Sequence, residues 1–190
     1  MEVITLDFET EAIVGNPLVT PPRAVGLAVH IPEEEPNYYA WGHPEGNNIR
    51  YDQMHEYAMR IKECGMPLLF HNAPFDLSVW NNEFCNARIY LWGDHWKRIH
   101  DTMYLLFLAD PYAPTYSLKP SAERWLNLAP EEQSSLRDWI LANVPMANNK
   151  NWGAYISLAP VQLVRPYAIG DVTRTRGLFD LLLPQVEGAA

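Results

Sequence analysis

The sequence predicts an α/β fold, and three observations along its 190 residues lead to that prediction. First, the chain opens with strand-like runs separated by turn-rich stretches, at residues 3–10, 24–31 and 37–44. Second, a helical pattern is followed by a short apolar strand, at residues 52–64 and 66–72. Third, the second half of the chain is mostly helical. Because strands joined by Gly- and Pro-containing turns tend to pair in sequence order, the three opening runs should form an antiparallel meander.

The first two helices are predicted by different signals. Met54, Tyr57 and Ile61 recur at helical spacing, so they should face the core from one side of a helix. The run PFDLSVWNNEF follows the short apolar strand and begins with Pro74, a residue suited to the first turn of a helix. This order of strand and helix places polar residues at strand ends, where α/β folds usually hold their sites.

Helix-start signals predict four further helices, at residues 101–110, 117–128, 130–144 and 159–184. We expect a break in the last of them near Pro166. Proline lacks the amide hydrogen that a helix interior needs, and it disfavours helical geometry in the preceding residue. The long final helix should therefore begin at Pro166, which places Tyr167 at its end.

Composition limits the class of protein. With 48% hydrophobic residues the chain can bury a proper core, and its length favours a single domain over residues 1–190. It contains neither an apolar run of about 18 residues nor a signal-peptide pattern, so we expect a cytoplasmic protein that does not enter a membrane. The cysteines, Cys64 and Cys85, show no metal-ligand spacing and are expected to be free thiols.

The formal net charge of −9 argues against a long electrostatic grip on duplex DNA, because phosphate binding usually draws on basic surfaces. The charge is compatible with an enzyme that holds only the end of a nucleic acid. In such a site, clustered carboxylates bind metal ions, and the ions supply the positive charge. The positions of the acidic residues therefore decide the functional prediction.

Acidic residues stand at places that an α/β fold can bring together. In the run ITLDFETE, Asp7 and Glu9 are two residues apart in a strand and so point to the same face. Asp76 follows the short apolar strand, and Asp171 lies four residues after Tyr167, on the same face of the last helix. Taken alone, the pair Asp7 and Glu9 fits a solvent-facing strand edge as well as a metal site.

Three ordered motifs carry a resemblance to a known family. They are DFE at 7–9, HNAPFD at 71–76 and YAIGD at 167–171. In this order they resemble the motifs of the DEDD superfamily of 3′-5′ exonucleases, in the tyrosine-bearing branch that includes RNase D and the proofreading domain of family A DNA polymerases. The run SLKPSAERWL at 117–126 is also similar to a helix of bacterial DNA polymerase I. Each motif alone is weak, whereas the ordered set across nearly the whole chain is strong.

The resemblance implies a fold, a cofactor and a set of metal ligands. Members of the superfamily have an RNase H-like fold, a mixed sheet flanked by helices, and bind two divalent cations, Mg²⁺ or Mn²⁺. By this resemblance Asp7 bridges both ions. Glu9 and Asp171 ligate the ion that holds the attacking water, and Asp76 holds the second ion partly through water. Carboxylate oxygens suit these hard cations, and the cations neutralise the gathered negative charge.

The implied reaction is hydrolysis of the terminal phosphodiester, which releases a nucleoside 5′-monophosphate. Tyr167 is expected to orient the attacking water, since a phenol with a pKa of about 10 is a poor base at neutral pH. By resemblance, Thr10 and Asn72 hold the terminal nucleotide, and Ile13 wedges between the last two bases. Ordinary packing explains Ile13 equally well. Stacking without base-specific contacts would make the hydrolysis independent of sequence.

Other conspicuous residues have simpler explanations. Asp101 precedes an apolar helix, so we interpret it as the N-cap rather than a fifth metal ligand. Three histidines without mutual ligand spacing are interpreted as structural: His71, His95 and His100. Three tryptophans are interpreted as packing residues: Trp125, Trp139 and Trp152.

The expected substrate is a single-stranded or frayed DNA 3′ end, with RNA as the alternative. No polymerase domain follows the motifs, so the sequence predicts either a standalone exonuclease, such as a phage enzyme in the host cytoplasm, or an excised proofreading domain. A polymerase on another chain would then supply the basic surface for duplex DNA. Two other classes stay open, an RNase D-like exoribonuclease and a non-catalytic nucleic-acid-binding module. The second is disfavoured because the four acids and Tyr167 are all present.

Overall fold

The computed structural model describes residues 1–84, 91 and 93–188. In this part of the chain five strands form one sheet, in the spatial order β3-β2-β1-β4-β5. The strands are β1 Ile4–Thr10, β2 Ala24–His30, β3 Asn37–Ala40, β4 Leu68–Phe70 and β5 Ile99–Asp101. The pairs β1–β2 and β2–β3 are antiparallel, whereas β1–β4 and β4–β5 are parallel. The predicted meander and the mixed sheet of an RNase H-like fold are therefore confirmed.

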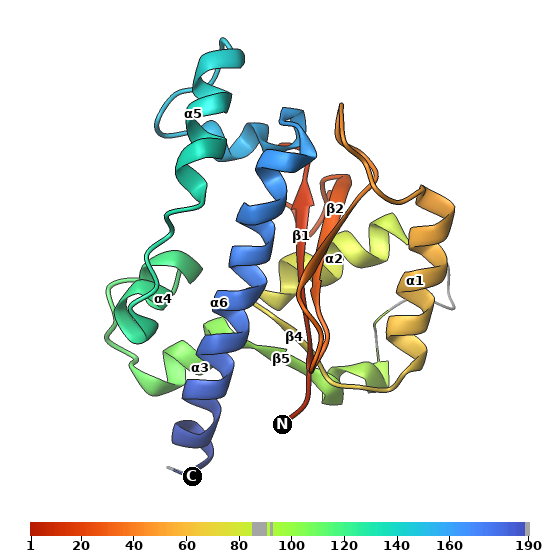
Figure 1. Ribbon diagram of the computed structural model, residues 1–190. Coiled ribbons are helices and arrows are strands. Elements are labelled where there is room, and N and C mark those ends of the chain that lie inside the picture. Colours follow the sequence, from red (N-terminus) through yellow and green to blue (C-terminus); the bar gives the residue numbers. More distant parts are fainter. Residues whose placement is uncertain (85–90, 92, 189–190) are drawn as a thin grey trace.

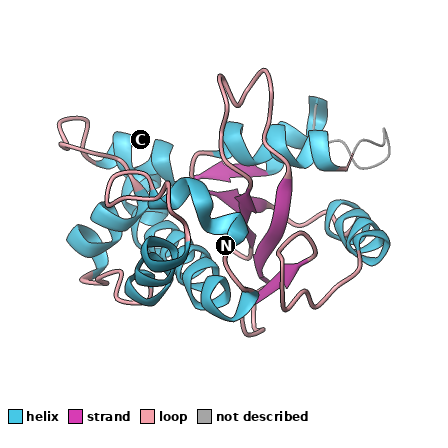
Figure 2. Ribbon diagram, turned by 90° about the horizontal axis from the view of Figure 1, so that it is seen from above, coloured by secondary structure: helices cyan, strands magenta, loops and turns pink. Residues whose placement is uncertain are grey.

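Helices cover both faces of this sheet, as Figures 1 and 2 show from two directions. The helices α1 (Tyr51–Glu63) and α2 (Ala73–Glu83) lie on one side. The long helix α6 (Val161–Gly188) lies across the other side. Packed against α6 are α3 Thr102–Ala109, α4 Leu118–Leu126 and α5 Gln133–Asn143. None of the helices in the described residues is both long and apolar enough to cross a membrane.

The alternation of side chains along β1 separates an apolar face from a polar one. Leu6 and Phe8 are buried in the core shared with α1 and α2. Because neighbouring residues of a strand point to opposite faces, Asp7 and Glu9 point to the face that α6 covers. The sequence alternation thus places two acids beneath the last helix.

Small residues on β2 leave room beside these acids. Asp7 pairs with Ala28, and Glu9 pairs with Gly26. A Cβ atom on Gly26 would lie 2.1 Å from the hydroxyl oxygen of Tyr38, so only glycine lets the Tyr38 side chain lie across β2. The Tyr38 hydroxyl also forms a buried 2.7 Å hydrogen bond with Nε2 of His43, which fixes the position of the Tyr38 ring.

The helix expected from residue 101 begins at Thr102, and the strand β5 before it was not predicted. This strand has three residues, two of which are His100 and Asp101, so it lacks the apolar run that marks a strand. Its pairing with β4 makes it a strand. The sequence also missed two 3₁₀ helices, η1 Gly93–Arg98 and η2 Trp152–Leu158.

The predicted break near Pro166 is wrong. The helix α6 runs without interruption from Val161 to Gly188 and includes Pro166 in its second turn. A proline there removes only the hydrogen bond to the carbonyl of residue 162, close to the start of the helix. Buried Val164 and Ala168 lie on either side of the proline and hold this part of α6 against the sheet. Tyr167 is therefore inside the helix, not at its end.

Candidate metal centre and active site

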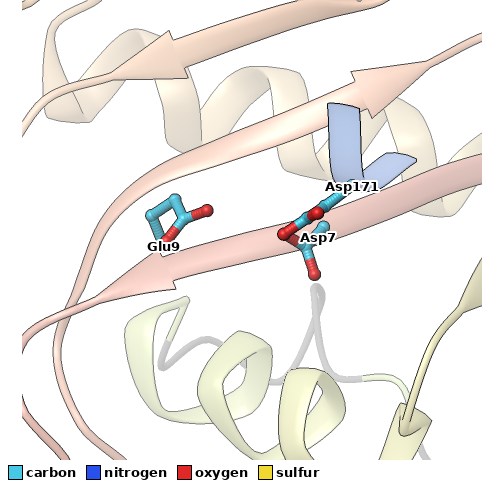
Figure 3. A group of neighbouring side chains, drawn as sticks. All are labelled: Asp7, Glu9 and Asp171. Atoms are coloured by element: carbon cyan, nitrogen blue, oxygen red, sulfur yellow. The ribbon is translucent and has the colours of Figure 1, made fainter. Parts of the chain in front are cut away.

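Three carboxylates converge between β1 and α6. Asp7 and Glu9 come from the polar face of β1, and Asp171 comes from α6. One carboxylate oxygen from each residue lies within 4.8 Å of the others. Figure 3 shows the three side chains. The structure thus brings together three of the four acids that the sequence analysis named as metal ligands. An all-oxygen donor set of this kind could hold a hard divalent cation.

Burial and mutual repulsion make this cluster unfavourable for ionised acids. Glu9 and Asp171 are each only 6% exposed. Burial, and then the charge of Asp171, raise the pKa of Asp7 to about 8. Burial and the charge of Asp7 likewise raise the pKa of Glu9 well above its ordinary value. Groups that favour protonation in this way need a positive charge beside them to remain ionised at neutral pH.

A lysine that the sequence analysis did not single out supplies one positive charge. The Lys119 ammonium lies 2.7 Å from both carboxylate oxygens of Asp171, and it donates a hydrogen bond to Oδ2. It also lies 3.9 Å from the centroid of the Tyr167 ring. Burial raises the pKa of Asp171, and the charge of Lys119 acts against this rise. Lys119 follows Leu118 at the start of α4, within the run SLKPSAERWL that resembles a DNA polymerase I helix, but this resemblance gave the lysine no role in the site.

Tyr167 lies at the edge of the cluster, one turn before Asp171 on α6. Its ring packs edge-on against Trp152 of η2, with ring centroids 6.0 Å apart. Burial and the charge of Asp171 raise the pKa of its hydroxyl well above the ordinary value. The hydroxyl therefore stays protonated at neutral pH and can act as a hydrogen-bond donor. Trp152 packs as predicted, and what it packs against is this tyrosine.

Asp76 is buried near the cluster but is not one of the three converging residues. It lies in the first turn of α2, and its Oδ1 accepts a 3.0 Å hydrogen bond from the backbone amide of Phe8. Burial and the charge of Asp7 raise its pKa well above the ordinary value. In this arrangement Asp76 holds the centre of β1 from the α2 side. Its expected role as a metal ligand stays a prediction.

A second charged network supports Asp171 from within α6. Arg174 is buried and donates hydrogen bonds to both carboxylate oxygens of Glu132 and to the carbonyl of Ala129. Its Nη1 lies 3.8 Å from Oδ1 of Asp171. A Cβ atom on Gly170 would lie 2.7 Å from both Nη1 of Arg174 and Oε1 of Glu132, so glycine at this position lets the ion pair pack against the helix. The one sequence signal of this network is the i, i+3 spacing of Asp171 and Arg174, which is typical of a helical pair.

The residues expected to bind substrate lie in two separate places. Thr10 and Ile13 line a pocket of about 260 Å³ together with Glu9. Ile13 is 53% exposed, so the alternative that it is an ordinary core residue is not supported. Asn72 does not line this pocket. It lies just before α2, where its backbone has a left-handed φ of 67°. Their expected roles stay predictions.

Asn72 also lines a pocket that the sequence analysis did not identify. This pocket has a volume of about 380 Å³, and its walls include Tyr104, Phe107 and Tyr116. Tyr104 is 65% exposed, so its ring is available to a ligand. The helical run that contains Tyr104 and Phe107 reads as apolar core in the sequence, which conceals its exposed aromatic side chains.

The predictions for Asp101 and for two of the histidines hold. Asp101 accepts a hydrogen bond from the amide of Met103 as the N-cap of α3, and it also accepts bonds from the amides of Asn72 and Ala73. Nδ1 of His71 forms a 2.9 Å hydrogen bond with Thr102, and burial lowers the pKa of His71 to about 4. His100 packs against Phe179.

The remaining tryptophans and the cysteines, interpreted from the sequence as packing residues and as free thiols, are found as follows. Trp125 and Trp139 pack against the hydrophobic clusters on the α6 side of the sheet. Cys64 is an exposed free thiol, as predicted. Cys85 and the side chain of His95 lie outside the described residues.

Comparisons with known proteins place this fold among nucleases. No protein-family model and no curated protein matches the chain. The apo form of a nuclease matches with a TM-score of 0.62 at 17% identity, over 99% of this chain and 74% of that one. Brucella melitensis NrnC with bound Mg²⁺ matches with a TM-score of 0.59 at 16% identity, over 99% and 75%. Brucella melitensis NrnC bound to pGG matches with a TM-score of 0.59 at 17% identity, over 99% of this chain and 74% of that one. At these identities the likeness shows a shared fold, which agrees with the RNase H-like fold that the motifs implied.

Proposed function

We propose that this protein is a metal-dependent 3′-5′ exonuclease whose single domain spans residues 1–190. The observation that carries the proposal is the convergence of Asp7, Glu9 and Asp171, with Tyr167 one turn from Asp171. The fold shared with nucleases supports it. Burial and mutual repulsion raise the pKa values of Asp7 and Glu9, so a bound cation would stabilise their ionised forms.

The donor set fits the two divalent cations expected from the motifs. Asp7, Glu9 and Asp171 would hold them, and Asp76 faces the same part of β1 from α2. Carboxylate oxygens favour Mg²⁺ and Mn²⁺, and the Mg²⁺ bound by NrnC supports this choice. When bound, such cations offset the charge of the acids and lower the pKa of a bound water.

The residues of the chain then orient and position the reactants. The Tyr167 hydroxyl, kept protonated by its raised pKa, donates a hydrogen bond that orients the attacking water. The attacking water loses a proton to solvent as its oxygen bonds to the phosphorus of the terminal phosphodiester. The bond from this phosphorus to the 3′ oxygen breaks, the 3′ oxygen takes up a proton from solvent, and a nucleoside 5′-monophosphate leaves. Arg174, which is fixed by its hydrogen bonds to Glu132, supports Asp171 from within α6. Positioning of this kind supplies a large part of the rate of such reactions.

Two pockets, one that includes Glu9 and one that includes Asn72, suit the last nucleotides of a strand. Thr10 and Ile13 line the smaller pocket next to Glu9. Asn72 and Tyr104 line the aromatic pocket, where a base can stack without being read by hydrogen bonds. We therefore propose single-stranded or frayed DNA 3′ ends as the substrate. The absence of sequence-specific contacts in this scheme fits an enzyme that trims any sequence.

A second candidate is the hydrolysis of short oligoribonucleotides, which the binding of pGG by NrnC favours. The neighbouring nucleases give no support to a polymerase partner or a proofreading role, so the proposal does not extend to either. Substrate length and sugar type separate the two candidates, while the site chemistry is the same in both.

The test is a hydrolysis assay with end-labelled single-stranded DNA, the matching RNA, and pGG. Each substrate is incubated with millimolar Mn²⁺ or with EDTA, beside the Asp7→Asn variant as a control for contaminating nucleases. The proposal predicts nucleoside 5′-monophosphates released from the 3′ end, in Mn²⁺ only and by the wild type only. Fast hydrolysis of pGG with slow hydrolysis of longer strands would favour the second candidate. No metal-dependent product from any of the three would contradict both.

A further inference from the structure

Lys119 is the residue of the site that the motifs leave unexplained. Its ammonium lies 2.7 Å from both oxygens of Asp171 and 3.9 Å from the centroid of the Tyr167 ring. The side chain of Lys119 is 19% exposed and that of Asp171 is 9% exposed, so the pair is largely removed from water. At this distance and burial, the attraction between the two charges is stronger than in a surface ion pair, and removal of either partner leaves the other charge buried and unpaired.

Two sets of contacts, one within α4 and one just after it, hold Lys119 in this position. Buried Ser121 and Ala122 pack α4 against α6, next to Lys119 on the same helix. Beyond α4, Arg174 of α6 binds the carbonyl of Ala129 and the carboxylate of Glu132. The segment that carries Lys119 is therefore fixed to the helix that carries Asp171.

We propose that Lys119 is an internal counter-ion, which takes the place of a metal cation at Asp171 and gives up that place when a cation binds. The inference rests on the proposed metal site. A divalent cation held by the oxygens of Asp171 would lie within a few ångströms of the ammonium, and two positive charges at that distance repel each other strongly in a buried site. Metal binding and the ion pair with Lys119 therefore compete for the same carboxylate.

The ion pair between Lys119 and Asp171 explains how the acidic cluster can persist in the folded protein without a metal ion. Asp7, Glu9 and Asp171 crowd together in a buried place, which favours unfolding or protonation unless a positive charge is present. Lys119 provides that charge within the chain itself. The face of the Tyr167 ring offers the ammonium a second attractive contact that does not depend on Asp171.

The experiment compares Lys119→Met with the matched control Lys150→Met, which removes the same charge from an exposed loop position. Isothermal titration measures Mn²⁺ binding, and thermal unfolding is followed in EDTA and in millimolar Mn²⁺. Lys119→Met should bind Mn²⁺ at least tenfold more tightly than the wild type, unfold at a lower temperature in EDTA, and recover this loss in Mn²⁺. Lys150→Met should match the wild type in every measurement.

The opposite results overturn the inference. A folded Lys119→Met variant that binds Mn²⁺ with unchanged or weaker affinity would show that Lys119 does not compete with the cation. If this variant is unfolded in EDTA, Mn²⁺ should fold it, and failure to fold at saturating Mn²⁺ assigns Lys119 to packing instead. Lys119→Arg keeps the charge and should retain an affinity close to the wild type. A wild-type protein that binds no Mn²⁺ would overturn the proposed function as well. Failure of the Lys119 inference alone would leave Mn²⁺ binding by the wild type intact, so the two failures can be told apart.

Discussion

Oδ1 of Asp76 accepts a 3.0 Å hydrogen bond from the backbone amide of Phe8, which ties the first turn of α2 to the middle of β1. Phe8 lies between Asp7 and Glu9, so Asp76 fixes the strand segment that carries two of the three converging acids. The same carboxyl group has its pKa raised by burial and by the charge of Asp7. Asp76 thus combines a stabilising hydrogen bond with a buried charge that destabilises the metal-free protein.

Two substitutions of Asp76 separate these effects. Asp76→Asn keeps an acceptor for the Phe8 amide and removes the charge, so in EDTA at pH 9 it should unfold at a higher temperature than the wild type. A gain of about 1 kcal/mol corresponds to roughly 2–4 °C for a chain of this size. Asp76→Ala leaves the amide unpaired and should unfold at a lower temperature. Differential scanning fluorimetry measures both, and an Asn variant no more stable than the Ala variant would show that the hydrogen bond does not matter.

Millimolar Mn²⁺ should reverse the order of wild type and Asp76→Asn. A ligand that binds only the folded state stabilises it, by about 2.7 kcal/mol at a hundred times its dissociation constant. The wild type should gain more than the variant if Asp76 helps to hold a cation. Equal gains in the two proteins would restrict Asp76 to its structural role at Phe8.

Asp7→Asn and Asp171→Asn should each reduce hydrolysis at least about a thousandfold, equivalent to roughly 4 kcal/mol in the barrier. Each substitution removes a carboxylate from the converging group of three. Single-turnover hydrolysis of labelled DNA in Mn²⁺ gives the rate, and circular dichroism checks the fold. Asp138→Asn, which changes a largely exposed side chain, is the control and should keep the wild-type rate. A rate above a tenth of wild type in either site variant would contradict the assignment.

Local geometry predicted part of the acidic site, and the ordered motifs that resemble a known family predicted the rest. Alternation along β1 sets the common direction of Asp7 and Glu9, and helical spacing puts Tyr167 beside Asp171. Lys119 could not be predicted in the same way. Its place in the site depends on how α4 packs against α6, and that packing arises from contacts between residues about fifty positions apart in the chain.

Other misses have comparable physical causes. The strand β5 is too short and too polar to show a pattern, and it becomes a strand only through its pairing with β4. Pro166 argued for a break, but burial of the α6 face that contains Val164 and Ala168 outweighs one lost hydrogen bond. The aromatic pocket escaped notice because an exposed Tyr104 and a buried one look alike in a sequence.

The metal-free protein should lose stability as pH rises from about 4 to about 8. The pKa of Asp7 is raised from 3.8 to about 8 in the folded protein. Between these values the folded state keeps a proton that the unfolded state has released, so the free energy of unfolding falls as pH increases. Urea unfolding in EDTA at several pH values measures the slope. Asp7→Asn cannot titrate and should show a shallower slope, whereas an identical slope would mean that Asp7 is not the group responsible.

Tyr167→Phe should slow hydrolysis roughly 10- to 1000-fold, a smaller loss than removal of a metal ligand. The substitution keeps the ring that packs on Trp152 and beneath Lys119, and it deletes only the hydroxyl. Affinity for Mn²⁺ should therefore stay within about twofold of wild type. Single-turnover kinetics and isothermal titration measure the two effects separately. Unchanged kinetics would return Tyr167 to a packing role.

The aromatic pocket beside Asn72 should bind a base of the substrate. Tyr104 is 65% exposed at the wall of this pocket, which Ile13 does not line. Base stacking on an aromatic side chain contributes about 1–3 kcal/mol, so Tyr104→Ala should raise KM roughly 5- to 100-fold. The value of kcat should change little, because Tyr104 lies outside the acidic cluster. Tyr112→Ala removes a tyrosine that is 96% exposed on the surface and serves as the control. Steady-state kinetics on single-stranded DNA and RNA give both constants. An unchanged KM for Tyr104→Ala on both substrates would mean that the nucleic acid does not enter this pocket, and the pocket beside Glu9 would then be the one to test by Ile13→Ala.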